Sequence, residues 1–167
     1  MHGYGVFHYY NGDFERGIWK EDNFIEGSVK KTYSDGYYEG EFKNEEFNGK
    51  GKYYYFDGDY YDGYWINDKF LKGTGRITYD NGYYEGEFYN YKKHGKGKYY
   101  FNNGNYFEGK YRFDEIIGDG EERINGVIYK GYYYNGLNEG KFTVIKDGQV
   151  DYIEYRNGEE KSKCIIY

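Results

Sequence analysis

Glycine recurs in this chain with a period of about 23 residues, and this recurrence limits the possible folds more than any other feature. One series runs through Gly17, Gly40, Gly63, Gly86, Gly109 and Gly131, at intervals of 23, 23, 23, 23 and 22 residues. Two further series, of Gly-x-Gly pairs and of turn dipeptides such as Asp57-Gly58, follow the same period. Such a period is typical of tandem repeats. The sequence therefore predicts an array of copies of one small unit.

Each copy reads as two β-strands joined by a short turn. In the copy spanning residues 37–58, Tyr38, Gly40 and Phe42 share one face of the first strand, because side chains alternate between faces. No long stretch has helical periodicity. Consecutive strands joined by short turns form an antiparallel meander, and the twist of the strands coils a sheet with so many members.

Aromatic rings must supply most of the buried apolar surface. Tyr, Phe and Trp make up 25% of the 167 residues, whereas Ala and Pro are absent and Leu occurs only at Leu71 and Leu137. This composition disfavours both a layered aliphatic core and a disordered chain. We therefore expect an all-β fold, an elongated, twisted, single-layer antiparallel sheet of tandem β-hairpins.

The glycines within the strands have a predicted structural role. Each lies on the same face as large aromatic side chains of neighbouring strands, so a ring can cover its bare backbone. The rings expected to tile this face are Tyr38, Phe42, Tyr61, Trp65, Tyr84, Phe88, Tyr99 and Phe101.

Charged residues predict the register between strands, since opposite charges facing each other across strands stabilise a sheet by roughly 0.2–1 kcal/mol per pair. The predicted partners are Gly40–Gly51, Phe42–Gly49, Glu41–Lys50, Glu39–Lys52, Glu87–Lys96, Glu85–Lys98, Asp62–Arg76 and Lys110–Asp119. The same register places Glu108 opposite Glu121, for which the sequence offers no explanation.

The repeat also predicts the domain organisation. Residues 1–148 are expected to form the array, with an incomplete first unit, and residues 149–167 a degenerate C-terminal capping hairpin. The net charge of −6 argues against a nucleic-acid partner. A single cysteine, Cys164, and the lack of a long apolar run favour a cytoplasmic location.

The pattern Tyr-x-Gly-x-aromatic, followed by Gly-x-Gly and an Asp/Asn-Gly turn, resembles the MORN (membrane occupation and recognition nexus) repeat. Residues 38–42 and 84–88 match it closely, and the resemblance extends from Gly3 to about Gly148. The departures at glycine positions are Val29, Phe142 and Glu154. The Asn-Gly expected in the hairpin loop remains at Asn135-Gly136 but is replaced by Asn44-Glu45, Asn67-Asp68 and Asn90-Tyr91, which leaves the loop shape open.

The resemblance implies an elongated sheet of stacked hairpins with a groove along it. Members of the family serve as scaffolds at membrane–cytoskeleton junctions; some bind a partner's helix, some self-associate, and some have been thought to bind phosphoinositides. Others are modules attached to a lipid kinase or a protein methyltransferase. We therefore expect a non-catalytic scaffold, peripheral to a membrane or the cytoskeleton, that binds a partner protein without a cofactor. The alternatives are an anionic-lipid-binding module and the accessory region of a larger enzyme.

The aromatic face is the candidate partner-binding groove, and the competing interpretation is a purely structural role. The expected groove residues are Tyr38, Phe42, Tyr61, Trp65, Tyr84, Phe88, Phe107 and Tyr111. Rings in a groove suit an amphipathic helix, with Trp65 and Phe88 as the central anchors. Sheet edges at residues 3–10 and 162–167 offer a second mode, edge pairing into a homodimer.

The basic cluster of Lys92, Lys93 and His94 is a candidate anion patch, although a solvated loop is the favoured interpretation. No histidine belongs to a nucleophile motif, so no catalytic residue is expected. Asp57-Gly58-Asp59 reads as a turn rather than a metal site. Choline- and glucan-binding surface repeats also use aromatic–glycine hairpins, but they are usually richer in Trp, so they remain a minor alternative.

Overall fold

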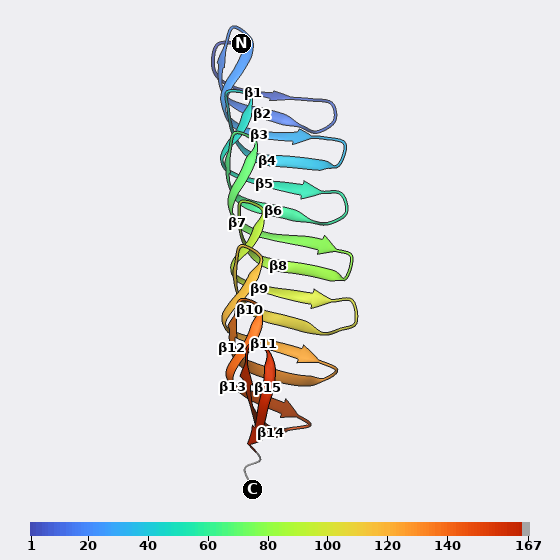
Figure 1. The fold of residues 1–167 in the computed structure, drawn as a ribbon. Helices are drawn as coiled ribbons and strands as arrows, with labels where there is room; N and C mark the ends of the chain where they lie inside the picture. The colour runs from blue at the N-terminus through green and yellow to red at the C-terminus, as the bar shows by residue number, and fades with distance from the viewer. Residues whose placement is uncertain (165–167) are drawn as a thin grey trace. The chain divides into compact units, whose positions relative to one another are not determined.

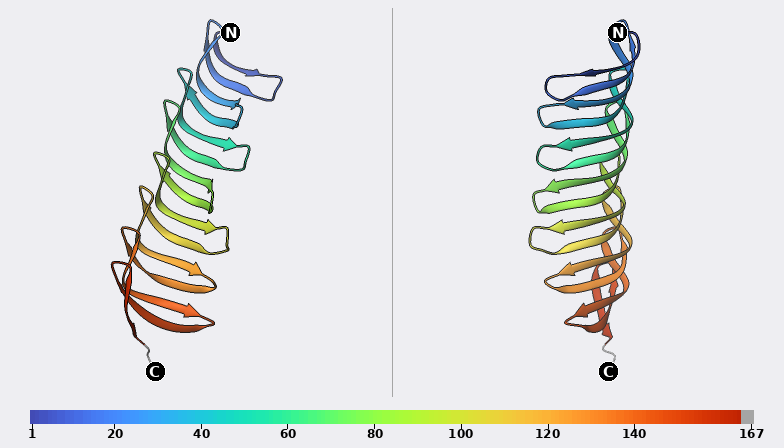
Figure 2. Two further views of the ribbon diagram at one scale, coloured as in Figure 1. Left: turned by 45° about the vertical axis from the view of Figure 1, so that its right-hand side comes forward. Right: turned by 180° about the vertical axis from the view of Figure 1, so that it is seen from behind.

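The structure, a computed structural model, describes residues 1–164, with side chains described as far as Lys161. Fifteen strands follow one another in that range: β1 (Gly3–His8), β2 (Phe14–Lys20), β3 (Asn23–Thr32), β4 (Gly36–Lys43), β5 (Glu46–Tyr55), β6 (Tyr60–Ile66), β7 (Lys69–Tyr79), β8 (Gly82–Tyr89), β9 (Lys92–Phe101), β10 (Tyr106–Arg112), β11 (Glu115–Ile124), β12 (Val127–Tyr134), β13 (Leu137–Lys146), β14 (Gln149–Arg156) and β15 (Glu159–Cys164). They form one open antiparallel sheet in sequence order (Figures 1 and 2), which confirms the predicted all-β sheet of hairpins. Within the described part, no helix is long and apolar enough to cross a membrane.

The chain divides into two compact units. The first unit comprises residues 1–76 with 88–91, and the second comprises residues 77–87 with the described residues from Lys92 onward. The predicted division into an array of residues 1–148 and a capping hairpin of residues 149–167 stays a prediction. Strands β14 and β15 lie in that last segment, whereas residues 165–167 lie outside the described residues.

Two kinds of turn join the strands. Between β4 and β5, Asn44 and Glu45 both have positive φ, 52° and 67°, which is the type I′ geometry normally favoured by Asn-Gly. Between β5 and β6, the Gly58 N–H donates to the Tyr55 carbonyl at 3.1 Å, and the Tyr55 N–H donates to the Asp59 carbonyl at 2.9 Å. The tight hairpin loop thus forms even where its second residue is not glycine.

The predicted register is correct at the glycines of the β4–β5 and β10–β11 pairs, but in the β6–β7 pair Gly63 lies opposite Gly73 rather than Gly75. Gly40 lies opposite Gly51, and Glu39 lies opposite Lys52. The register then shifts between Gly40 and Phe42, so Phe42 pairs with Phe47 instead of Gly49. Such an irregularity gives the two strands unequal numbers of residues.

The same kind of shift changes the other predicted charge pairs. Glu41 falls within the irregularity of the β4–β5 pair and has no partner at Lys50. In β10, the shift after Gly109 places Lys110 opposite Ile117 rather than Asp119. In both pairs the second strand has two more residues than the first across the shift, so other side chains come to face each other, which is why charge complementarity alone misplaced these partners.

Ion pairs form mainly between hairpins rather than within them. Asp62 lies opposite Thr74, not Arg76, and its carboxylate pairs with Lys52 on β5 at 3.6 Å. Lys98 pairs with Glu108 on β10 at 2.9 Å. The predicted facing of Glu85 by Lys98 and of Glu87 by Lys96 stays a prediction. The predicted contact of Glu108 with Glu121 is present.

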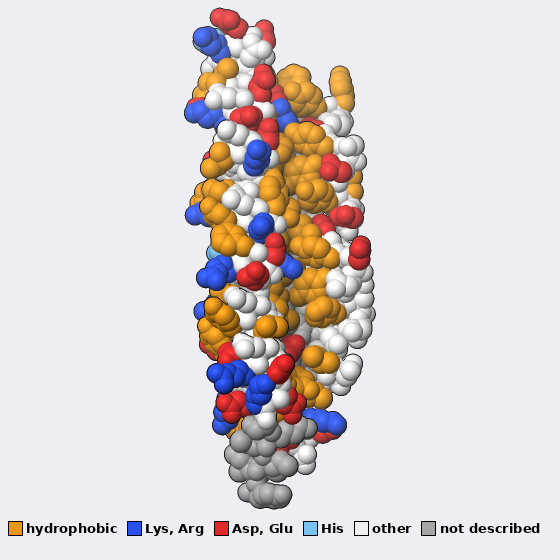
Figure 3. All heavy atoms as spheres, viewed as in Figure 1, with side chains coloured by type: hydrophobic (Ala, Val, Ile, Leu, Met, Phe, Trp, Pro, Cys, Tyr) orange, Lys and Arg blue, Asp and Glu red, His pale blue; other side chains and the backbone are white. Residues whose placement is uncertain are grey.

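The strand glycines allow close approach of neighbouring backbones and of rings. A Cβ at Gly63 would lie 2.7 Å from the Cα of Gly73, a contact that real Cβ atoms do not make. A neighbouring glycine Cα lies as close or closer to the Cβ positions of Gly17, Gly40 and Gly86. It lies 3.2 Å from the Cβ position of Gly109, and at Gly131 the Phe142 ring takes its place. The rings of Tyr38, Tyr84, Phe107 and Phe142 cover Gly51, Gly97, Gly120 and Gly131. The predicted covering of glycine by rings is therefore confirmed, and hydrophobic side chains gather over the strands between charged ones (Figure 3).

Candidate functional site

The eight side chains of the predicted groove all belong to the buried aromatic core. They are Tyr38, Phe42, Tyr61, Trp65, Tyr84, Phe88, Phe107 and Tyr111, with exposed fractions between 0% and 7%. A partner could reach little of their surface without displacing neighbouring side chains. Truncation of Trp65 or Phe88 should therefore reduce fold stability, and their role as partner anchors stays a prediction.

Phe47, the second residue after the tight turn of Asn44 and Glu45, closes over the rings of Tyr38 and Trp65. Phe47 stacks on Tyr38 with ring centroids 3.7 Å apart, and it meets Trp65 edge-on at 5.7 Å. Beneath it, the Tyr38 hydroxyl donates a hydrogen bond to the Glu41 carbonyl at 2.9 Å. The shift after Gly40 brings Phe47 opposite Phe42 and so makes this covering possible. The sequence interpretation missed Phe47 and Phe70 because it placed them in a loop.

Partly exposed rings stand on this core. In the first unit they are Tyr33, Tyr55 and Tyr91, which we call the aromatic rim. Tyr33 contacts Phe47 with centroids 5.9 Å apart, and Tyr91 contacts Tyr61 at 5.3 Å. Tyr33 and Tyr91 are 42% and 43% exposed, so they present surface that the core rings do not. Strand alternation could have identified Tyr55, which follows Tyr53 on the same face.

In the second unit, Tyr79 and Phe101 hold the places of Tyr33 and Tyr55. Both rings are partly exposed, and both contact the buried ring of Tyr99, with centroids 5.9 and 4.8 Å away. Each unit therefore carries exposed aromatic side chains supported by buried ones.

The three residues of the predicted anion patch have different environments in the structure. Lys92 is exposed, whereas Lys93 is half-buried and the His94 ring lies 5.1 Å from that of Phe113. Burial lowers the pKa of Lys93, and the Asp114 carboxylate acts in the opposite direction. Whether anions bind at Lys92, Lys93 and His94 stays a prediction.

The Lys93 ammonium lies among tyrosine rings. Its Nζ is 5.2–5.9 Å from the ring centroids of Tyr79, Tyr84, Tyr99 and Tyr111. A hollow of about 360 Å³ opens beside it, lined in part by Phe101, Asp114 and Ile116. We call these four tyrosines and Lys93 the Lys93 box.

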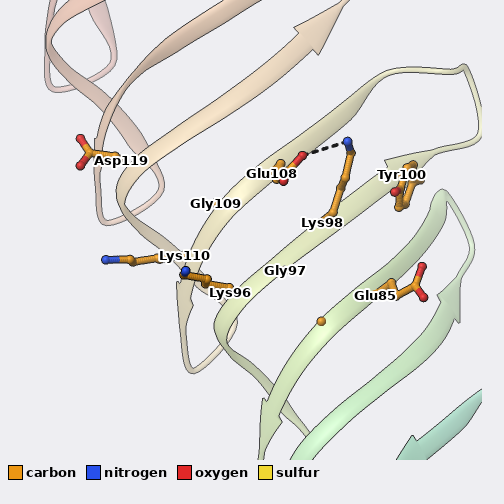
Figure 4. A pocket seen from close by; sticks show the side chains of 10 residues that line it. Glu85, Lys96, Gly97, Lys98, Tyr100, Glu108, Gly109, Lys110 and Asp119 are labelled. Carbon is orange, nitrogen blue, oxygen red and sulfur yellow. Dashed lines mark hydrogen bonds and ion pairs between the residues drawn. The ribbon is translucent and has the colours of Figure 1, made fainter.

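The other face of the sheet carries charged side chains. A hollow of about 600 Å³ lies over Gly97 and Gly109 and is bordered by Lys98 and Glu108, whose ion pair is drawn in Figure 4. Lys96 and Lys110 lie opposite each other on β9 and β10 and border the same hollow, as do Glu85 and Asp119. Side chains of both signs therefore surround this hollow, which gives it no preference for one charge.

The buried hydroxyls are poor candidates for chemistry. Burial raises the pKa of Tyr38, Tyr84 and Tyr111, so these groups stay protonated at neutral pH. In the part of the chain that the structure describes, no group of three or more His, Cys, Asp or Glu side chains is placed to hold a metal ion.

A known family model matches three segments of the chain. The family model of the MORN repeat matches residues 1–14, 38–60 and 84–106. Between the matched segments, the sheet continues with hairpins that also pair glycine with glycine, such as Gly17 opposite Gly27 and Gly63 opposite Gly73. No curated protein matches the chain.

Proposed function

Because this chain belongs to the MORN-repeat family, we propose that it is a non-catalytic scaffold that binds a partner protein. MORN repeats are a non-catalytic repeat family and generally mediate interactions with proteins or membranes. The finer proposal is that a helix or peptide of the partner lies on the aromatic rim, and that the complex forms in the cytoplasm where a membrane meets the cytoskeleton.

The aromatic rim is the observation that carries this proposal. Tyr33 and Tyr91 are exposed rings that rest on the buried rings of Phe47 and Tyr61, and the partly exposed Tyr55 rests on Tyr53. A supported ring has few conformations to lose when a partner covers it, so its burial contributes more fully to affinity. Tyrosine is also enriched among the residues that dominate protein interfaces.

Capture of partners by the intact chain, followed by affinity measurement with the purified partner, tests the proposal. The variant Tyr33→Ser/Tyr91→Ser should weaken binding by roughly tenfold or more, because both rings are expected contacts. Tyr64→Ser is the matched control, since Tyr64 is 43% exposed, like Tyr91, but alternates with the buried Trp65 and faces the other side of β6. Melting curves check that all variants fold.

Equal affinity of the wild type and the rim variant, or loss of binding in Tyr64→Ser alone, would contradict a partner site on the rim. Binding to anionic lipid, a homodimer formed by edge pairing, attachment to a larger enzyme, and choline or glucan binding stay predictions.

A further inference from the structure

Lys93 occupies a place that phenylalanine holds two repeats earlier. Five rings lie around Phe47 with centroids 3.7–6.3 Å away, namely those of Tyr33, Tyr38, Tyr53, Trp65 and Phe42. The first four of these positions recur 46 residues later as Tyr79, Tyr84, Tyr99 and Tyr111, around Lys93. The repeat therefore builds the same box twice and fills it once with a ring and once with a cation.

The hydrogen bonds around the two boxes also correspond. The Phe47 N–H donates to Asp68 Oδ1 at 2.8 Å, and the Lys93 N–H donates to Asp114 Oδ1 at 2.9 Å. The Tyr53 hydroxyl donates to Asp35, and the Tyr99 hydroxyl donates to Asn81 in the same way. These hydrogen bonds and the four ring positions are the same in both boxes. The exchange of phenylalanine for lysine therefore changes the chemistry at the centre of the box and leaves the surrounding structure unchanged.

The box around Lys93 is electrically suited to a cation. The ammonium lies 5.2 Å from the ring centroids of Tyr79 and Tyr99, and the faces of such rings carry partial negative charge. Among the described side chains, no carboxylate forms an ion pair with Lys93 and no acceptor takes a hydrogen bond from its ammonium. The ring faces are thus its main support, and Asp114 adds negative charge at the margin of the hollow.

The box is also accessible. Tyr79 is 38% exposed, whereas Tyr84, Tyr99 and Tyr111 are buried, so the box opens to solvent beside Tyr79. Lysine has a flexible four-carbon stem and a strongly hydrated head, which allows the Lys93 side chain to leave for water. The space that it vacates, together with the hollow of about 360 Å³, has room for another side chain.

We propose that the Lys93 box is a cation-binding cage, that Lys93 is its internal occupant, and that a basic side chain of a partner protein replaces Lys93 in the cage. The partner's identity rests on the proposed scaffold function, and the net charge of −6 favours a basic partner. An anionic ligand is disfavoured, because the ring faces and Asp114 oppose it.

Three forms of the full chain test the cage without a partner: the wild type, Lys93→Ala, which empties the box, and Lys93→Phe, which restores the residue found at position 47. The probe is tetramethylammonium chloride, with sodium chloride at equal concentration as the reference. The ring signals of Tyr79, Tyr99 and Tyr111 are followed by NMR. Lys93→Ala should bind the probe roughly tenfold tighter than the wild type, because no internal cation competes. Lys93→Phe should show no saturable shift.

Two results overturn the proposal: a folded Lys93→Ala chain that shows no saturable binding, or equal binding by Lys93→Ala and Lys93→Phe. If Lys93→Ala does not fold, binding of tetramethylammonium to the wild type is the deciding measurement. The probe must then displace Lys93, seen as a loss of the ring-current shift of its Cε protons, and Tyr79→Ala must weaken that displacement. No displacement in the wild type rejects the cage.

Affinity measurements with the partner protein give a separate test. A partner that loses affinity for Tyr33→Ser/Tyr91→Ser but binds the wild type and Lys93→Phe equally leaves the scaffold function intact and rejects the cage as its site. A partner whose affinity falls in Lys93→Phe and rises in Lys93→Ala supports the cage.

Discussion

Glu108 and Glu121 lie directly opposite each other on β10 and β11, and each carboxylate pairs with a lysine of the strand on its other side. Lys98 lies 2.9 Å from Glu108, and Lys130 lies 2.8 Å from Glu121. The four side chains form a row in which the two carboxylates are flanked by the two ammonium groups. This arrangement explains how the sheet accommodates two like charges that face each other.

Lys130→Ala should therefore destabilise the fold by about 1 kcal/mol, because Glu121 would face Glu108 without its counter-charge. Chemical denaturation measures the change in the free energy of unfolding. The double variant Lys130→Ala/Glu121→Gln should recover most of the loss. Lys161→Ala, which breaks an exposed pair with Glu159, is the control and should cost close to nothing. A loss no larger than that of the control would show that the row is not coupled.

The same contact should be visible as a pH dependence. Hydrogen bonds from Lys130 and Tyr106 lower the pKa of Glu121 below its usual value of 4.5. A carboxyl group with a lowered pKa in the folded state contributes stability above its unfolded pKa, and the contribution is lost as the pH falls through the folded pKa. The difference in stability between the wild type and Lys130→Ala should thus be present at neutral pH and shrink in acid. A stability difference between the wild type and Lys130→Ala that stays constant down to low pH would contradict this assignment.

Gly63→Ala should cost about 2–3 kcal/mol, because the new Cβ would collide with the backbone of Lys72 and Gly73. Backbone atoms in a paired strand cannot turn aside as a side-chain tip can. Gly58→Ala is the matched control: its Cβ meets nothing within 4 Å, and only its φ of +98° opposes the change. Thermal melting should show a clearly larger loss for Gly63→Ala. Similar losses at both positions would mean that close backbone approach is not what selects glycine at position 63.

The parts of the fold that follow from period and alternation could be predicted from the sequence. Glycine spacing indicated that Gly40 meets Gly51, and alternation placed Tyr38 and Phe42 on the covered face. The shift after Gly40 could not be predicted, because Glu41 and Lys50 suit an unshifted register equally well. Phe47 reaches the core through that shift. The sequence therefore also could not show that the rings of the predicted groove are covered.

The Lys93 box shows a different limit. Lys92, Lys93 and His94 read as a surface cluster because the residues were judged by charge along the chain. The informative comparison was between equivalent positions of the repeat, where Lys93 stands in the place of Phe47 and Phe70. That signal was present in the sequence, but its meaning depends on the rings that come together around position 93.

Alkaline pH should unfold the protein in step with ionisation of its tyrosines. Burial raises the pKa of Tyr38 and Tyr84 above the ordinary value of 10.0, and their hydroxyls donate to the carbonyls of Glu41 and Glu87. A group whose pKa is raised on folding contributes stability below its unfolded pKa, which is lost as the pH rises toward the folded pKa. Stability should thus be retained to about pH 10 and fall above it.

The ultraviolet absorbance of tyrosinate and circular dichroism, recorded on the same samples, check this expectation. Buried tyrosines such as Tyr38 and Tyr84 should ionise together with the loss of structure. The double variant Tyr38→Phe/Tyr84→Phe should show a weaker dependence of stability on alkaline pH. Complete ionisation with the dichroism unchanged would contradict the assignment.

Glu45→Gly should stabilise the hairpin of β4 and β5 by about 0.5–1 kcal/mol, because Glu45 has a φ of 67° that costs a side-chain-bearing residue energy and costs glycine little. Glycine loses more backbone entropy on folding, which keeps the gain below the full relief of strain. Glu39→Gly, in the middle of β4, is the control and should destabilise by a similar amount, since glycine weakens an extended strand. Chemical denaturation of both variants should give changes of opposite sign; destabilisation by Glu45→Gly would show that the turn side chain contributes contacts that outweigh its backbone strain.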